Sequence, residues 1–214
     1  MRLKTSLLIL LALQLFCFSI SYAQTDNLGR KDKLYTSSGF GFTFPLGETS
    51  DYFKPKFSTT IGLNIGLGDG GLFLYPKVDL HAYKYDQQML EPGQTTLFRS
   101  GRSTTYLLNM ALGYRKFHGN FAYYGFLGGG GGFLLVPKIN LENGNTVATQ
   151  SNKTVGMGIL ETGIGIEYSL NKVSLFLESS FMHGFQKIQD RRFQSVPISI
   201  GIKPNLSSII NGKN

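Results

Sequence analysis

The sequence predicts an all-β fold, an eight-stranded antiparallel up-and-down transmembrane β-barrel, and three observations lead to this prediction. From Thr36 onward, apolar residues recur with a period of two, which is the repeat of a strand and not of a helix. Many of the alternating segments are about 11 residues or longer, which is enough to cross a membrane at a tilt. Tight turns and longer connections alternate between them, as in barrels with short periplasmic turns and longer outer loops.

Eight segments are expected to be strands, and in seven of them apolar side chains share one face. In the first segment, Phe40, Phe42 and Phe44 lie on the apolar face, and Gly41 and Thr43 lie on the other. The fifth segment is ambiguous in its facing because glycines interrupt the pattern. The expected strands cover about residues 36–46, 57–67, 71–85, 102–117, 121–136, 154–170, 172–185 and 194–204.

The connections between these segments are of two kinds. Residues 68–70, 118–120 and 171–172 contain the glycine and asparagine residues that tolerate the positive φ of tight turns. Between the tight turns lie connections that are longer and more polar. The longer connections are expected at residues 47–56, 86–101, 137–153 and 186–193.

The N-terminal segment has the composition of a secretory signal. Arg2 and Lys4 supply a positive start, residues 7–20 are almost uninterruptedly apolar, and residues 21–23 place small side chains where a signal peptidase cleaves. The apolar stretch is short for a membrane-spanning helix, which disfavours a retained anchor. The expected division is a signal peptide at 1–23, a periplasmic N-terminal tail at 24–35, the outer-membrane β-barrel at 36–204 and a C-terminal tail at 205–214.

Composition and charge narrow the class of protein. Cys17, the single cysteine, lies within the leader, so the mature chain is expected to have no disulfide and no thiol chemistry. The formal net charge of +8 includes Arg2 and Lys4, which leaves roughly +6 on the mature chain. These cations lie near strand ends and loops without forming a basic stripe. This favours a solvated excess, leaves attraction to anionic lipid head groups as an alternative, and disfavours nucleic acid.

The face opposite the apolar one carries ionisable residues of both signs. An eight-stranded barrel leaves an interior just wide enough for side chains to fill, and unpaired charge there would be costly. We therefore expect a salt-bridged interior network and no open pore. A periplasmic lipocalin-like barrel, the alternative, would turn its apolar face inward around a ligand. The expected network consists of Lys77, Asp79, His81, Arg115, Glu161, Glu167, Glu178 and Lys203.

Five consecutive glycines, residues 128–132, interrupt the fifth segment. Such a run resembles a phosphate-binding loop, but the Lys-Ser/Thr pair that should follow is absent, and the flanking residues are those of an aromatic strand. We expect the run to allow strong coiling or close packing across the barrel interior.

The order of signal peptide, eight strands rich in glycine and tyrosine, and the final strand at residues 196–203 resembles a known family. It is similar to the outer-membrane β-barrel domain proteins of Bacteroidota, which include porin-family members. The resemblance covers about residues 36–204 and implies an integral barrel in the cell outer membrane, often of unassigned function. Many relatives end the last strand on an aromatic residue, whereas this chain continues to Asn214.

The three histidines are the residues from which catalysis would be expected, and none has the required surroundings. His118 lies in a tight turn. Lipid A deacylases pair a strand histidine with a serine two residues on, but here His183 is followed by Phe185 at that position. His81 lies near Asp79 and could serve as an oriented base, yet no inward serine is assignable beside it. The spacing of the histidines does not suit a metal site. We therefore expect no catalytic residue, no cofactor and no metal.

The expected function is a structural or interaction role for a barrel with a lumen plugged by side chains. The alternatives are a narrow channel for small solutes and a lipid-modifying outer-membrane enzyme. The expected partners are outer-membrane lipids and lipopolysaccharide, together with a surface glycan or a protein that contacts loops 86–101 and 137–153. Nucleic acid is not expected.

Overall fold

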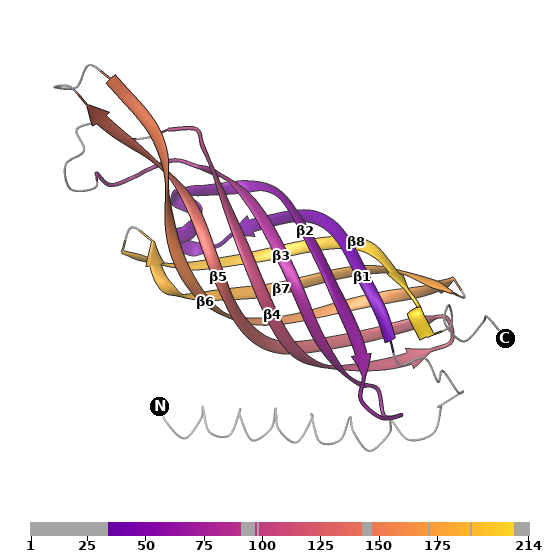
Figure 1. Ribbon diagram of the computed structural model, residues 1–214. Helices are drawn as coiled ribbons and strands as arrows, with labels where there is room; N and C mark the ends of the chain where they lie inside the picture. The colour runs from indigo at the N-terminus through magenta and orange to yellow at the C-terminus, as the bar shows by residue number, and fades with distance from the viewer. Residues whose placement is uncertain are drawn as a thin grey trace, which may run out of the picture.

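Eight strands form a closed barrel in the computed structural model, which describes residues 34–90, 97, 99–142, 147–170, 172–188 and 190–207 (Figure 1). Each strand pairs antiparallel with the next along the chain, and the last strand pairs with the first. The predicted up-and-down barrel is therefore confirmed. The strands are β1 (Leu34–Pro45), β2 (Phe53–Gly66), β3 (Leu72–Tyr85), β4 (Gly101–His118), β5 (Phe121–Glu142), β6 (Val147–Leu170), β7 (Val173–Ile188) and β8 (Arg191–Pro204).

The barrel begins at Leu34, slightly before the predicted position, and its two ends are tied together. Tyr35 forms an isolated bridge with Asn205, and the Leu34 backbone N–H donates a hydrogen bond to Ser207 Oγ at 3.0 Å. The start of the predicted C-terminal tail is thus joined to β1. The predicted signal peptide at 1–23 lies outside the described residues, as do residues 24–33 and 208–214.

The outer surface of the barrel is apolar because the apolar side chains, which alternate along each strand, point away from the interior. Ile164 is 70% exposed, Ile61 and Leu108 are 65% exposed, and Phe40 is 63% exposed. A water-soluble protein does not expose such a continuous apolar surface, whereas a membrane barrel presents it to lipid. The lipocalin-like alternative, which would need the apolar face inside, is therefore wrong.

The two longest connections, between β1 and β2 and between β3 and β4, lie at one end of the barrel. The turns between β2 and β3 and between β4 and β5 are tight, and Gly68, Gly71 and Gly119 have the positive φ expected there. Figure 1 shows the barrel termini at this short-turn end and the β5–β6 hairpin projecting from the opposite end. We call the opposite end the loop end.

Three of the predicted long loops are shorter than expected. The predicted loop at 137–153 is mostly strand, because β5 continues to Glu142 and β6 begins at Val147. Likewise, β7 and β8 leave only a two-residue turn, in which Asp190 has positive φ. The prediction was wrong here because the segment is polar, and polar composition is typical of a loop. Strand pairing needs only backbone hydrogen bonds, so paired strands can form without an alternating apolar face.

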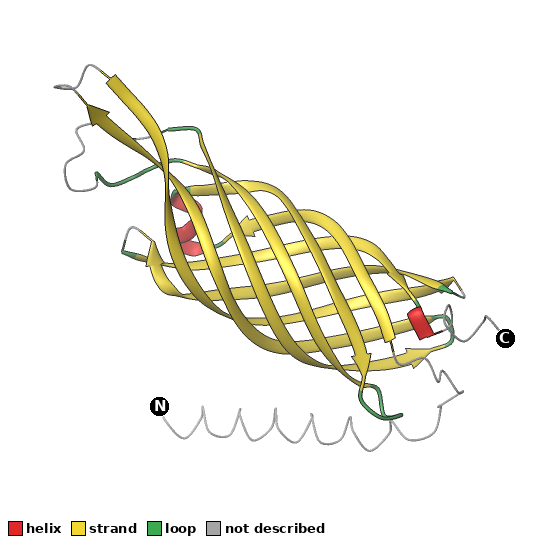
Figure 2. Ribbon diagram, viewed as in Figure 1, coloured by secondary structure: helices red, strands yellow, loops and turns green. Residues whose placement is uncertain are grey.

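The first long connection is partly helical. A short 3-10 helix, η1 (Gly47–Asp51), follows β1 at the loop end (Figure 2). Its Thr49 side chain is buried, and Thr49 Oγ1 donates to the Arg192 carbonyl oxygen and accepts from the Gln194 backbone N–H at 3.0 and 2.9 Å. These bonds fix η1 on the start of β8. No helix among the described residues is long and apolar enough to cross a membrane.

The glycine run of β5 allows that strand to pack closely on β4. A Cβ atom at Gly128, Gly130 or Gly132 would collide with backbone atoms of β4. At Gly130 the added atom would also lie 2.6 Å from the Asn109 side-chain oxygen, so this glycine leaves the space that Asn109 uses inside the barrel. The run therefore has a packing role against the neighbouring strand β4, whereas the packing expected from the sequence was across the barrel interior.

Candidate functional site: the barrel interior

The interior of the barrel has three successive regions, ordered by the position of their residues along the strands. At the loop end lies a buried apolar group that we call the mouth layer. In the middle lies a group of carboxylates around Lys77, and near the short turns lies a second charged group around Glu167. The mouth layer consists of Tyr52, Phe53, Tyr83, Tyr85, Leu107, Leu134, Val136, Met157, Ile159, Met182, Ile188 and Phe193.

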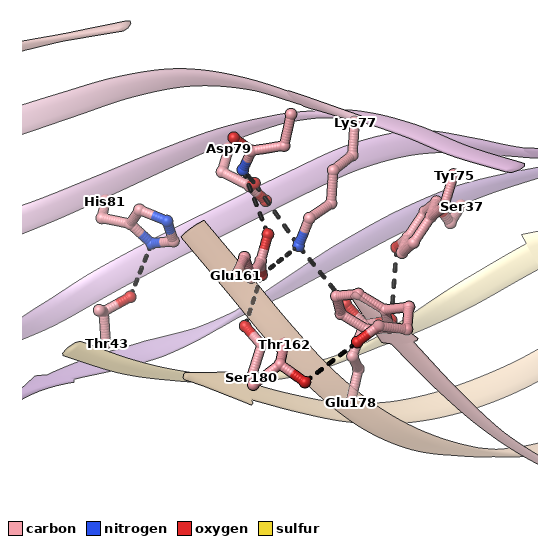
Figure 3. A network of polar contacts seen from close by, with 12 residues as sticks. Ser37, Thr43, Tyr75, Lys77, Asp79, His81, Glu161, Thr162, Glu178 and Ser180 are labelled. Carbon is pink, nitrogen blue, oxygen red and sulfur yellow. Dashed lines mark hydrogen bonds and ion pairs between the residues drawn. The ribbon is translucent and has the colours of Figure 1, made fainter. Parts of the chain in front are cut away.

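The central group places three carboxylates around one ammonium group (Figure 3). Lys77 Nζ lies 2.6 Å from Glu161 Oε1, 3.6 Å from Asp79 Oδ2 and 3.8 Å from Glu178 Oε1. All four side chains are buried, and they come from β3, β6 and β7. We call these four residues the Lys77 cluster. With one cation and three carboxylates, it has a formal excess of negative charge.

Neutral donors satisfy the carboxylates that Lys77 alone cannot. Asn109 Nδ2 donates to Asp79 Oδ2 at 2.8 Å and lies 3.2 Å from Glu161 Oε2. Ser180 Oγ donates to Glu161 Oε1 at 2.6 Å, and Tyr124 OH donates to Glu178 Oε2 at 2.7 Å. Buried carboxylates are tolerated only when hydrogen bonds of this kind replace water. Each of the three carboxylates has such a donor.

The second charged group has the opposite balance of charge. Lys203 Nζ lies 2.7 Å from Glu167 Oε1, and Arg115 Nη2 lies 3.1 Å from the same oxygen. Arg115 also donates a hydrogen bond to the Asn64 side-chain oxygen. We call Arg115, Glu167 and Lys203 the Glu167 cluster. It has two cations for one carboxylate, and therefore a formal excess of positive charge.

Aromatic rings separate the two clusters and stabilise the surplus cations. Lys203 Nζ lies 4.0 Å from the centre of the Tyr124 ring and 4.8 Å from that of Phe176, and Arg115 Cζ lies 4.8 Å from that of Phe73. Cations are attracted to ring faces at such distances. Tyr124 joins the two clusters, because its ring contacts Lys203 while its hydroxyl donates to Glu178.

The structure thus brings seven of the eight predicted interior residues into two clusters, and His81 lies apart. His81 is buried, and its Nδ1 lies 2.7 Å from Thr43 Oγ1 (Figure 3). The neighbouring Asp79 carboxylate contacts Lys77 and Asn109 instead. The arrangement therefore does not form the Asp–His pair that would orient a general base.

A small cavity lies between His81 and the Lys77 cluster. Its volume is about 10 Å³, which is the space that one water molecule needs. It is lined by Thr60, Lys77, Asp79, His81, Glu178, Ser180, Pro197 and Ser199. The cavity can hold a water molecule among polar groups, but it has no room for a sugar, a nucleotide or a lipid chain.

The mouth layer contains residues that sequence reasoning missed. Phe53 packs against Tyr83 and Phe193, with ring centres 5.1 and 6.1 Å apart, and Tyr52 lies 4.8 Å from Phe53. Tyr52 and Phe53 belong to a segment predicted to be an outer loop. The hydrogen bonds of η1 to β8 direct them into the barrel. Burial raises the pKa of Tyr52 to about 12.

The other two histidines lie on β4 and β7. His118 is exposed at the end of β4. His183 Nδ1 lies 3.2 Å from Gln194 Nε2, and its ring centre lies 5.8 Å from that of Phe185. Over the part of the chain that the structure describes, no group of three or more histidine, cysteine or acidic residues is arranged to hold a metal ion.

Comparison with known proteins gives the fold but no family. No protein-family model matches the sequence, and no curated protein matches it. The barrel is similar to the crystal structure of Neisserial surface protein A, with a TM-score of 0.57 and 13% identity, over 81% of this chain and 97% of that chain. It also aligns with Ail, the attachment invasion locus protein of Yersinia pestis (TM-score 0.43, 12% identity, 80% and 99% of the two chains). The N-terminal β-barrel domain of Pseudomonas aeruginosa OprF gives a TM-score of 0.42 and 12% identity, over 80% of this chain and 98% of that chain.

The likeness to Neisserial surface protein A shows the shared fold, and the apolar exterior supplies the location. A closed barrel satisfies all of its backbone hydrogen bonds between strands, which makes it one of two architectures able to span a bilayer. Together with the exposed apolar faces, this places the chain in the cell outer membrane as an eight-stranded β-barrel.

Proposed function

We propose that this chain is an integral outer-membrane barrel with a lumen closed to solutes, and that it has a structural or interaction role and is not an enzyme. The observation that carries the proposal is the continuity of buried side chains along the interior. The mouth layer, the Lys77 cluster and the Glu167 cluster follow one another, and the cavity of about 10 Å³ lies among them. A solute would have to break ion pairs and displace aromatic rings to pass.

Planar-bilayer recording tests the closed lumen. The purified barrel is expected to give no conductance above that of the lipid alone. Tyr52→Ala/Phe53→Ala/Phe193→Ala, which removes three buried rings of the mouth layer, should also stay closed, because the Lys77 and Glu167 clusters still fill the lumen. Stable channel steps from the unaltered protein would support the narrow-channel alternative and overturn the proposal.

The β5–β6 hairpin and the 86–100 connection support an interaction role. Figure 1 shows the hairpin extending beyond the other strands at the loop end, where the described residues 86–90 leave β3 and residues 99–100 enter β4. Loops and projecting elements on a rigid scaffold are where binding residues are most often found. We propose that a surface glycan or a protein partner contacts these two segments, which correspond to the predicted loops 86–101 and 137–153.

Mass spectrometry of lipid A tests the non-enzymatic part of the proposal. Cells with and without the protein are expected to give the same lipid A species, since His81 is bonded to Thr43 and His183 faces Phe185 on the outer surface. A change in acylation that depends on the protein would favour the lipid-modifying enzyme instead.

Two further assignments complete the proposal. We infer that residues 1–23 are a cleaved signal peptide, so the mass of the mature protein should correspond to a chain that begins at Gln24. A mature mass that includes residues 1–23 would contradict this.

We also assign the chain to the outer-membrane β-barrel domain proteins of Bacteroidota, on the pattern of eight strands and the final strand at residues 196–203.

A further inference from the structure

Three cations lie side by side on the outer surface at the loop end of the barrel. Lys54 of β2 pairs with Lys84 of β3, and Lys84 pairs with Arg102 of β4. All three side chains are exposed. We call these residues the cationic row. Because neighbouring strands lie about 4.8 Å apart, the row is roughly 10 Å long.

Few described groups neutralise the cationic row. Lys54 Nζ donates a hydrogen bond to the Ser50 carbonyl oxygen at 2.8 Å. Lys84 Nζ lies 3.9 Å from Asp86 Oδ2, a long contact, while the other oxygen of Asp86 accepts from the Ser100 backbone N–H. No ion pair joins Arg102 to any residue that the structure describes. Like charges directly opposite one another repel, so a bound anion would stabilise the row.

The position of the cationic row relative to the apolar band indicates where that anion would be. On β4, Leu108, Tyr106 and Arg102 all face outward, and Arg102 lies nearest the loop end. Tyr106 stacks on Phe133, with ring centres 5.1 Å apart. Aromatic residues mark the margin of the apolar band in outer-membrane barrels. The row therefore lies just beyond the lipid tails, at the level of the outer-leaflet head groups.

We propose that the cationic row binds the phosphate groups of a phosphorylated glycolipid head group, that of lipopolysaccharide, in the outer leaflet. Arg102 can present two parallel N–H donors to one phosphate, while Lys54 and Lys84 act as point charges beside it. The inference requires the loop end to face outward but does not depend on a closed lumen. Bilayer conductance therefore leaves it untouched.

Lipopolysaccharide binding by the refolded barrel in detergent tests the proposal, with native mass spectrometry as the readout. The main variant is Lys84→Gln/Arg102→Gln, and the matched control is Lys116→Gln/Lys172→Gln, which removes two exposed cations near the short turns. Each cation near a lipid surface contributes about a fivefold change in affinity, so the main variant should bind roughly 30-fold more weakly. Adding Lys54→Gln should bring the loss to roughly 150-fold. Affinity of the control should stay within about twofold of the unaltered protein, since this pair lies at the opposite end of the barrel.

Two additional arms identify the ligand. Enzymatically dephosphorylated lipopolysaccharide should bind the unaltered protein as weakly as intact lipopolysaccharide binds the main variant. Inorganic phosphate at millimolar concentration should fail to compete. Equal losses in the main variant and the control, or undiminished binding of the dephosphorylated lipid, would overturn the proposal. Effective competition by inorganic phosphate would overturn the assignment to a lipid head group.

A stability measurement separates binding from folding. In detergent without lipopolysaccharide, the main variant should be at least as heat-stable as the unaltered protein, because the substitution removes repulsion between like charges. Added lipopolysaccharide should raise the unfolding temperature of the unaltered protein more than that of the variant. A variant that is already less stable without lipid would indicate a structural role for the row and contradict the proposal.

Discussion

The mouth layer and the Lys77 cluster are both buried in the barrel interior, but they are built from different kinds of side chain. The mouth layer is packed from aromatic and aliphatic side chains, as in the core of a soluble protein. The Lys77 cluster holds one cation and three carboxylates that also depend on neutral donors. An apolar layer requires only size and shape, whereas buried charge requires particular partners at particular distances. The two regions should therefore respond differently to substitution.

The largest expected effect comes from removing the cation of the Lys77 cluster. Lys77→Met should lower the free energy of unfolding by about 4 kcal/mol, because it leaves three buried carboxylates without their shared cation. The measurement is denaturant unfolding in lipid vesicles. Adding Glu161→Gln should restore part of the loss, and Lys56→Met, at an exposed position, should change little. A loss below about 1 kcal/mol would mean that the cluster does not depend on Lys77.

The mouth layer should tolerate the exchange of one apolar side chain for another better than the Lys77 cluster tolerates the loss of a charged one. Phe193 is fully buried, and Phe193→Ala should cost about 3 kcal/mol by creating a cavity. Phe193→Leu should cost less than about 1.5 kcal/mol, because apolar neighbours can repack around a similar volume. The same unfolding assay measures both. If the leucine variant lost as much as the alanine variant, the mouth layer would be as specific as the charged region, and the comparison would fail.

Alkaline pH should weaken the mouth layer through Tyr52. Its pKa is about 12 in the folded barrel and about 10 in an unfolded chain, so only the neutral form is well accommodated. The contribution is fully present below pH 10 and is lost as the pH rises toward 12, by at most about 1.4 kcal/mol per pH unit. The free energy of unfolding should therefore fall more steeply with pH in the unaltered protein than in Tyr52→Phe. Identical slopes for the two proteins would show that Tyr52 is not buried in solution.

Removing a single neutral donor of the central region should have a smaller effect than removing Lys77. Ser180→Ala removes the hydrogen bond to Glu161 at 2.6 Å and should cost about 2 kcal/mol, because the acceptor is charged. In a Lys77→Met background, the loss of stability caused by Ser180→Ala should differ from this value, because Lys77 and Ser180 both contact Glu161 Oε1. Strictly additive losses in this double-mutant cycle would show that the cluster is a set of independent pairs.

The sequence predicted the strands well because the alternation of apolar residues is strong wherever a strand faces lipid on one side. The facing of Lys77, Glu161 and Lys203 follows from the same alternation. Their division into two clusters does not, because it depends on which strands lie opposite one another across the barrel. His81 illustrates this limit: it shares a face with Asp79, yet it bonds to Thr43 on β1.

The mouth layer was not predictable for a different reason. Tyr52 and Phe53 follow a polar segment, and nothing in their spacing distinguishes an inward turn from an outer loop. Their burial depends on Thr49, which bonds to the distant residues Arg192 and Gln194. Long-range contacts of this kind leave no periodic signal. The extension of β5 to Glu142 and the start of β6 at Val147 were missed because residues 137–153 are mostly polar and show no sustained alternation of apolar residues.

Access of a water-soluble thiol reagent to the middle of the barrel tests the central claim most directly. The chain has one cysteine, Cys17, and with that position changed to serine a single cysteine can be introduced at Ser199, which lines the central cavity. The closed-lumen account predicts that Ser199→Cys stays unmodified in the folded barrel and reacts after heat unfolding, while the exposed Ser100→Cys reacts in both states. Modification of folded Ser199→Cys at a rate comparable with that of Ser100→Cys would contradict a closed lumen. The reagent would then have a path to the central cavity, either through the mouth layer or past the Glu167 cluster.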